Sequence, residues 1–249
     1  MSVNWSPLTD ELRIWRTEGL QLPLWWRDDD AIEATPALDR LTRLAEDLAL
    51  PVHVAVIPKL AKADLAAFIA GHDATIALVH GWQHVSHAPV GEKNAEFGHP
   101  RPDALAEATA ALRQMKLHFP DRLIEIFVPP WNRLDAALLP GLAQAGYLGV
   151  STYLPRHSRL AAPGLVQINT HIDPIFWRGG RGLVPPDDII AGLVSVLEDR
   201  RRGITDQTEP LGFLTHHLVH TEDVWQFSRA LLSTLLDHGA TPADLRQLP

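Results

Sequence analysis

Short apolar segments alternate along the chain with longer segments whose apolar residues recur at helical spacing. The short segments are apolar or β-branched and end at Pro, Gly or polar turns, which is typical of strands. Their nearly continuous apolar character suits strands that are buried on both faces of a parallel sheet. The predicted strands are Leu22–Arg27, Val52–Ile57, Thr75–His80, Leu123–Val128, Leu148–Thr152, Val166–Thr170 and Leu211–His216.

Helices are predicted between these strands. Thr35 and Pro36 form an N-cap followed by a proline in the first turn, and leucines then recur at helical spacing. Seven strands that alternate with helices predict an α/β fold, either a barrel or an open doubly wound sheet. The other predicted helices are Asp103–Phe119, Leu134–Ala145, Pro186–Arg200 and Glu222–Asp237.

Polar residues gather where five of the predicted strands end. In both α/β architectures the ligand site lies at the carboxyl ends of the strands, so these residues are expected to converge there. They are Asp28–Asp30 after the first strand, His80 at the third, Pro129–Arg133 after the fourth, His171 and Asp173 after the sixth, and His216–His217 at the seventh.

Composition narrows the chemistry. The 249 residues contain no Cys, which excludes disulfides, thiolate metal sites and a cysteine nucleophile. A net charge of −8 argues against a nucleic-acid partner. No stretch approaches the roughly 18 apolar residues of a membrane helix, and the first residues lack a basic-then-apolar leader pattern. We therefore expect a soluble cytoplasmic protein without a membrane partner, and the 13 His become its most informative residues.

Two groups of residues have the properties of metal ligands. Asp28, Asp29 and Asp30 are adjacent carboxylates that repel one another and need a cation, a base or solvent nearby. His80 and His84 are four residues apart, so a helical turn would place both imidazoles on one face. Two His and one carboxylate leave coordination positions open, as in a catalytic site for zinc or a similar divalent ion.

Two further segments suggest acid–base and binding roles. A His at the end of the seventh strand can act as a general acid or base near neutral pH, and Asp173 is a candidate to orient it. The two prolines of Pro129–Arg133 fix an extended turn. Such a turn could present a backbone N–H to an oxyanion and the Trp131 ring to a sugar.

These motifs, in this order from about Leu22 to His220, resemble the polysaccharide deacetylase superfamily of the carbohydrate esterase family 4 type. The resemblance implies a distorted (β/α)7 barrel as a single catalytic domain over residues 1–249, with an N-terminal helical extension at about 1–20 and a C-terminal helix. It also implies a divalent metal, usually zinc, held by Asp-His-His, and hydrolysis of an N-acetyl group or related amide.

The family's motifs transfer residue by residue. His80 and His84 match its His-x-x-x-His motif as metal ligands, with Asp30 as the third ligand and Asp29 as the catalytic base. A register one residue earlier would make Asp29 the ligand and Asp28 the base. Leu214-Thr215-His216 matches the family's Leu-x-His motif and implies that His216 is the acid, with His217 as the alternative and Asp173 as the orienting residue.

The chain departs from the family in one loop. The family's Arg-x-Pro-Pro-aromatic-Gly loop carries an Arg that pairs with the base, but here Val128 stands at or beside that position and Asn132 replaces the Gly. Arg27 or Arg133 could supply the guanidinium instead. The difference in this loop places the chain in an outlying branch of the family. The expected substrate contacts are Trp131, Asn132, Arg133, Trp82 and His171.

The resemblance implies the removal of an acetyl group from an N- or O-acetylated carbohydrate. A cyclic imide or another small non-sugar amide is an alternative substrate on the same scaffold. A carbohydrate-binding pseudoenzyme and a metal-dependent sugar isomerase are the alternatives of a different class. A pseudoenzyme would lack the base or the acid, and an isomerase would need more carboxylate ligands.

Overall fold

Seven parallel strands form the centre of the protein in a computed structural model that describes residues 3–243 and 245–247. Neighbouring strands are hydrogen-bonded in the order β7-β5-β4-β3-β2-β1-β8. Each corresponds to one of the seven predicted strands, and the predicted barrel-type α/β fold is confirmed. Their bounds are β1 Leu22–Ala31, β2 Val52–Val56, β3 Thr75–His80, β4 Leu123–Val128, β5 Gly149–Val150, β7 Leu165–Gln167 and β8 Leu211–Thr215.

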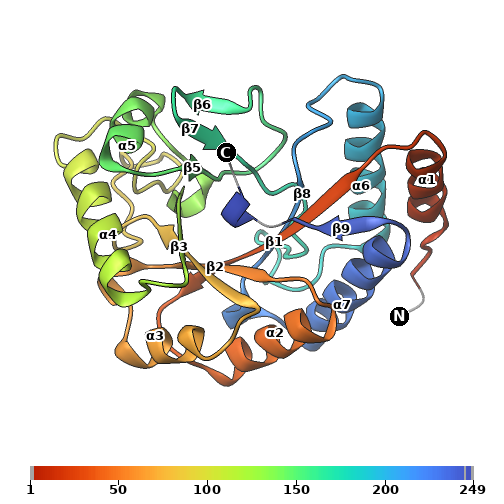
Figure 1. Ribbon diagram of the computed structural model, residues 1–249, viewed down its shortest axis with the longest axis horizontal. Coiled ribbons are helices and arrows are strands. Elements are labelled where there is room, and N and C mark those ends of the chain that lie inside the picture. Colours follow the sequence, from red (N-terminus) through yellow and green to blue (C-terminus); the bar gives the residue numbers. More distant parts are fainter. Residues whose placement is uncertain (1–2, 244, 248–249) are drawn as a thin grey trace.

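Helices surround the strands (Figure 1). The Thr35 hydroxyl accepts a hydrogen bond from the Leu38 N–H at 3.0 Å, which confirms the predicted N-cap. The helices are α1 Ser6–Thr17, α2 Pro36–Asp47, α3 Ala63–Ala70, α4 Ala104–His118, α5 Leu139–Ala145, α6 Pro186–Arg201 and α7 Glu222–Asp237. None of these helices is long and apolar enough to cross a membrane.

Several short elements were not predicted. Helix α3 is only eight residues long, too short to show a clear period. The predicted helix Leu134–Ala145 is shorter in the structure, because a 3-10 turn at Ala136–Leu138 precedes α5. The remaining short elements are β6 Leu160–Ala162, β9 Ala240–Pro242 and the 3-10 turns Pro58–Leu60, Pro130–Asn132, His217–Val219 and Leu245–Gln247.

The strands are closed into a ring by a short seam between β7 and β8 instead of a continuous ladder. After β7 the chain passes along the end of β5, where the Ile168 N–H donates to the Val150 carbonyl. It then reaches β8, where an isolated parallel bridge joins Ile172 to Phe213. The Leu214 N–H donates to the Ile172 carbonyl at 2.8 Å. Residues 168–172 therefore connect the β7 side of the sheet to β8.

Apolar side chains alternate between two sides of the strands. On β1, Trp25 belongs to a cluster built almost wholly from strand residues, whereas Trp26 belongs to the larger cluster that includes the helices. Successive side chains of a strand point to opposite faces, so Trp25 faces the inside of the ring and Trp26 faces the helices. The burial of both faces explains why the strands have nearly continuous apolar sequences.

Candidate metal and catalytic site

The three aspartates lie within the last residues of β1, so this strand extends further than its predicted end at Arg27. By alternation, Asp28 points toward the helices and Asp29 into the ring. The pairing with β2 shifts register between Asp28 and Ala31, and Asp30 adopts a left-handed φ of 77°. This irregularity interrupts the alternation, as a β-bulge does, and Asp30 lines the same pocket as His80 and His84.

Asp30, His80 and His84 form the only group of potential metal ligands found among the described residues. The Asp30 Oδ1 atom is 3.0 Å from His80 Nε2 and 3.2 Å from His84 Nε2. Burial would raise the pKa of Asp30, but the hydrogen bond and charge of His80, together with His216 and His84, hold that pKa well below its usual value. Burial and the charge of His80 lower the pKa of His84.

The donor set fits a divalent metal ion. His80 Nδ1 lies 3.0 Å from the Val128 carbonyl, which can only accept, so Nε2, which faces Asp30 Oδ1, is the nitrogen available to a metal ion. All three ligand atoms lie within 4.8 Å of one another. Two imidazoles and one carboxylate suit zinc or a similar ion and leave room for water or substrate. The structure brings Asp30 together with the two histidines, which favours the register with Asp30 as ligand over the alternative with Asp29.

The two histidines do not lie on a helical turn, so that part of the sequence interpretation is wrong. After His80, the chain turns through Gly81 and His84, which have left-handed φ angles of 54° and 58°. The buried Glu96 carboxylate accepts hydrogen bonds from three consecutive N–H groups of this turn, at Trp82, Gln83 and His84. A polar anchor 12 residues away therefore shapes the loop, and the spacing of the histidines alone could not reveal it.

A guanidinium beside Asp29, which the sequence does not provide at Val128, is provided by Arg27. Its side chain is fully buried and contacts Asp29 through two nitrogens, at 2.8 and 2.9 Å. It also donates to Asn132 Oδ1 and Ser151 Oγ, both at 2.7 Å. The Arg133 guanidinium instead donates to the Asn94 carbonyl. Of the two candidates from the sequence, Arg27 is thus the partner of Asp29.

His216 and His217 face different surroundings. His216 lines the pocket, and its ring lies 4.7 Å from that of Trp177. Its Nδ1 atom is buried and has no hydrogen-bond partner among the described residues. His217 is fully buried and donates both its N–H and Nδ1–H to Asp28, which also accepts from the Thr215 hydroxyl. Asp28 and His217 therefore form an internal pair away from the pocket.

Asp173 lies beside His216 in the pocket, but its hydrogen bonds go elsewhere. One oxygen accepts from the Ile175 N–H at 2.9 Å and the other from Trp177 Nε1 at 2.8 Å. Burial raises the pKa of Asp173, and the charge of His216 opposes that rise. The predicted orienting role therefore remains a prediction that rests on charge and proximity.

A pocket of about 740 Å³ surrounds these groups. Of the predicted substrate contacts, Trp131, Asn132 and Arg133 line it. Trp131 and Asn132 both have left-handed φ angles, and the Trp131 ring lies 4.3 Å from that of His84. Trp82 lies outside the pocket lining, because its ring packs against the hydrophobic core with the Lys59 ammonium 5.8 Å above it.

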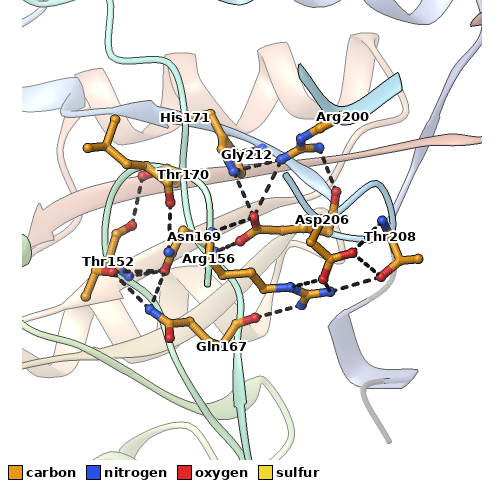
Figure 2. Close-up of polar contacts among 12 residues, drawn as sticks. Thr152, Arg156, Gln167, Asn169, Thr170, His171, Arg200, Asp206, Thr208 and Gly212 are labelled. Carbon is orange, nitrogen blue, oxygen red and sulfur yellow. Dashed lines mark hydrogen bonds and ion pairs between the residues drawn. The ribbon is translucent and has the colours of Figure 1, made fainter. Parts of the chain in front are cut away.

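His171 also lies outside the pocket, which corrects its expected position. Figure 2 shows its ring in a network of polar contacts that includes Arg200 and Gly212. The His171 and Glu209 side chains are fully buried, with His171 Nε2 at 3.2 Å from the Glu209 carboxylate and the Gly212 N–H donating to Nδ1. Arg200 donates to the Glu209 carbonyl at 2.7 Å. His171 thus supports the closure of the ring.

The fold is shared with known proteins, although no family model and no curated protein matches the sequence. A Streptococcus mutans family 4 carbohydrate esterase superposes with a TM-score of 0.58 at 11% identity, covering 94% of this chain and 90% of that one. For the Streptomyces lividans family 4 esterase, determined with acetate, the TM-score is 0.55 at 14% identity, covering 91% and 94%. The chain has the fold of the family 4 carbohydrate esterases.

Not every family 4 neighbour is an enzyme. A family 4 pseudoenzyme from Bacillus anthracis superposes with a TM-score of 0.56 at 13% identity, covering 92% of this chain and 65% of that one. A shared fold at such low identity therefore does not itself establish activity. The activity of this chain has to be argued from its own site residues.

Proposed function

We propose that this protein is a metal-dependent hydrolase that removes an acetyl group from an N- or O-acetylated carbohydrate. The observation that carries the proposal is the convergence of Asp30, His80 and His84 beside His216 in one pocket. A catalytic metal centre of this kind needs three protein ligands, an open coordination position and groups that move protons.

The ligand set would be Asp30 Oδ1, His80 Nε2 and His84 Nε2. A bound divalent ion would supply Lewis acidity and lower the pKa of a water molecule toward neutrality. Asp29 would take the proton of the attacking water. Arg27 fixes the orientation of this buried carboxylate through their paired contacts.

The leaving group would receive its proton from His216. This histidine is favoured over His217 because it lines the pocket, whereas His217 is fully buried against Asp28. Asp173 would stabilise the imidazolium through its charge. The backbone N–H of Trp131 would stabilise the developing oxyanion, and the rings of Trp131 and Trp177 would contact the sugar.

The experiment combines metal analysis with a substrate panel. His80→Ala should lose stoichiometric metal and hydrolysis, whereas the matched variant His118→Ala, at the end of α4, should retain both. Acetate release from acetylated sugars would support the proposal. Hydrolysis confined to cyclic imides would move the function to the small-amide alternative. Unchanged metal content in His80→Ala would refute the metal site, and metal binding without any turnover would indicate a pseudoenzyme.

A further inference from the structure

Three arginines stand around the pocket that holds the candidate metal site. Arg133, Arg178 and Arg181 all line it, whereas the carboxylates of the lining, among the residues that the structure describes, are Asp30 and Asp173. None of the three arginines takes part in an ion pair between described residues. This concentration of positive charge is unexpected in a chain whose net charge is −8.

Arg178 and Arg181 lie on a structured loop, residues 175–183. Ile175 and Leu183 form an antiparallel bridge at its base. The Phe176 N–H donates to the Gly182 carbonyl at 2.8 Å, and the Arg181 N–H donates back to the Phe176 carbonyl at 3.1 Å. A Cβ at Gly179 would lie 2.0 Å from the Phe176 ring, so the ring packs directly on the glycine. The loop is thus closed by its own contacts.

The loop is also joined to the catalytic groups. Trp177 donates its indole N–H to Asp173 and places its ring edge-on to His216. Arg181 lies over the same indole, 6.0 Å from its centre, and has a left-handed φ of 64° that a residue with a side chain rarely adopts. Arg181 therefore lines the pocket next to Trp177, the residue that contacts both Asp173 and His216.

From this arrangement we propose that the substrate carries an acidic group, a carboxylate or a phosphate, that binds Arg178 and Arg181. This inference rests on the proposed function, because it places the acetyl group at the Asp30 side of the pocket. Guanidinium groups form paired hydrogen bonds with carboxylates and phosphates, which a neutral sugar cannot match. The substrate class is thus an acetylated acidic sugar, such as an acetylamino sugar bearing a lactyl ether or a phosphate ester.

The direct test measures binding and does not depend on turnover. Isothermal titration compares N-acetylglucosamine with N-acetylmuramic acid and N-acetylglucosamine 6-phosphate, which separates the carboxylate from the phosphate. At least one acidic sugar should bind roughly tenfold more tightly than the neutral one, and added salt should reduce the difference. The double variant Arg178→Gln/Arg181→Gln should lose this preference, and Arg43→Gln, on α2 outside the pocket, should keep it.

Equal affinity of the wild-type protein for all three sugars would overturn the proposal, as would a preference that survives in the double variant. The proposed function is tested separately by acetate release from the metal-loaded protein. Turnover of neutral and acidic sugars at equal kcat/KM would retain the hydrolase and reject the acidic substrate. Preferential binding without acetate release would retain the acidic ligand and reject the hydrolase.

Discussion

The buried pair of Arg27 and Asp29 allows the clearest quantitative prediction. Replacing Arg27 with Met removes the guanidinium but keeps an unbranched side chain of similar length. Asp29, whose side chain is only 4% exposed, would then be left as a charge without its partner inside the protein. The variant should therefore be strongly destabilised.

The expected magnitude follows from the contacts. Breaking a buried ion pair by removing one partner costs about 3–5 kcal/mol. The lost hydrogen bonds to Asn132 and Ser151 would add about 1 kcal/mol each. Together these terms are a large fraction of the roughly 5–15 kcal/mol that stabilises a typical domain.

Urea unfolding of a double-mutant cycle isolates the pair. The wild-type protein, Arg27→Met, Asp29→Asn and the double variant are compared by circular dichroism at pH 7. Because Asn132 and Ser151 lose their partner in both backgrounds, their contributions cancel, and a coupling energy of about 3 kcal/mol should remain. Additive effects, within about 0.5 kcal/mol, would refute the assignment of Arg27 as the partner that stabilises the Asp29 charge.

Three further predictions follow from other parts of the structure. Glu96→Gln places an NH2 group against the backbone N–H donors that the carboxylate now accepts from. Zinc affinity, measured by chelator competition, should therefore fall about 10–100-fold. The control Glu92→Gln, at an exposed position, should leave the affinity unchanged. Burial lowers the pKa of His220 to about 4, so the unfolded chain binds a proton between about pH 6.5 and 4 that the folded protein does not. Stability should therefore decline by about 3 kcal/mol as the pH falls through this window, and an equal decline in His220→Gln would contradict the assignment. Gly212→Ala should unfold at a much lower temperature, because its Cβ would lie 2.4 Å from the Asn169 carbonyl oxygen. Gly192→Ala, in open space on α6, should be neutral or stabilising. Similar melting temperatures of the two variants would disprove the clash.

The ring of strands was predictable because burial on both faces leaves a strong local signal. Trp25 and Trp26 are adjacent and both fully buried, one inside the ring and the other against the helices. Strand ends were less accurate. The apolar run stops at Arg27, yet β1 continues through the aspartates, because Asp28 and Asp30 have partners on distant segments that the local sequence does not show.

The site was predictable in its residue types but not in its connections. The order of the motifs indicated Asp30, His80 and His84, and the structure brings their ligand atoms together. The roles of Glu96 and Arg27 depend on contacts across the fold, such as the 2.7 Å hydrogen bond from Arg27 to Asn132. Such pairs leave no periodic pattern, because burial of a single polar side chain depends on partners far away in the chain.

The seam between β7 and β8 has a consequence for self-association. An open parallel sheet presents unpaired N–H and C=O groups at its two edges, and such edges can template the addition of strands from other molecules. Here the outer edge of β8 is occupied from within, since the Gly212 carbonyl accepts from the His171 N–H and the Gly212 N–H donates to the His171 ring. Five residues of irregular chain, held by the buried Glu209, thus cover the β8 edge against pairing with a strand from another molecule.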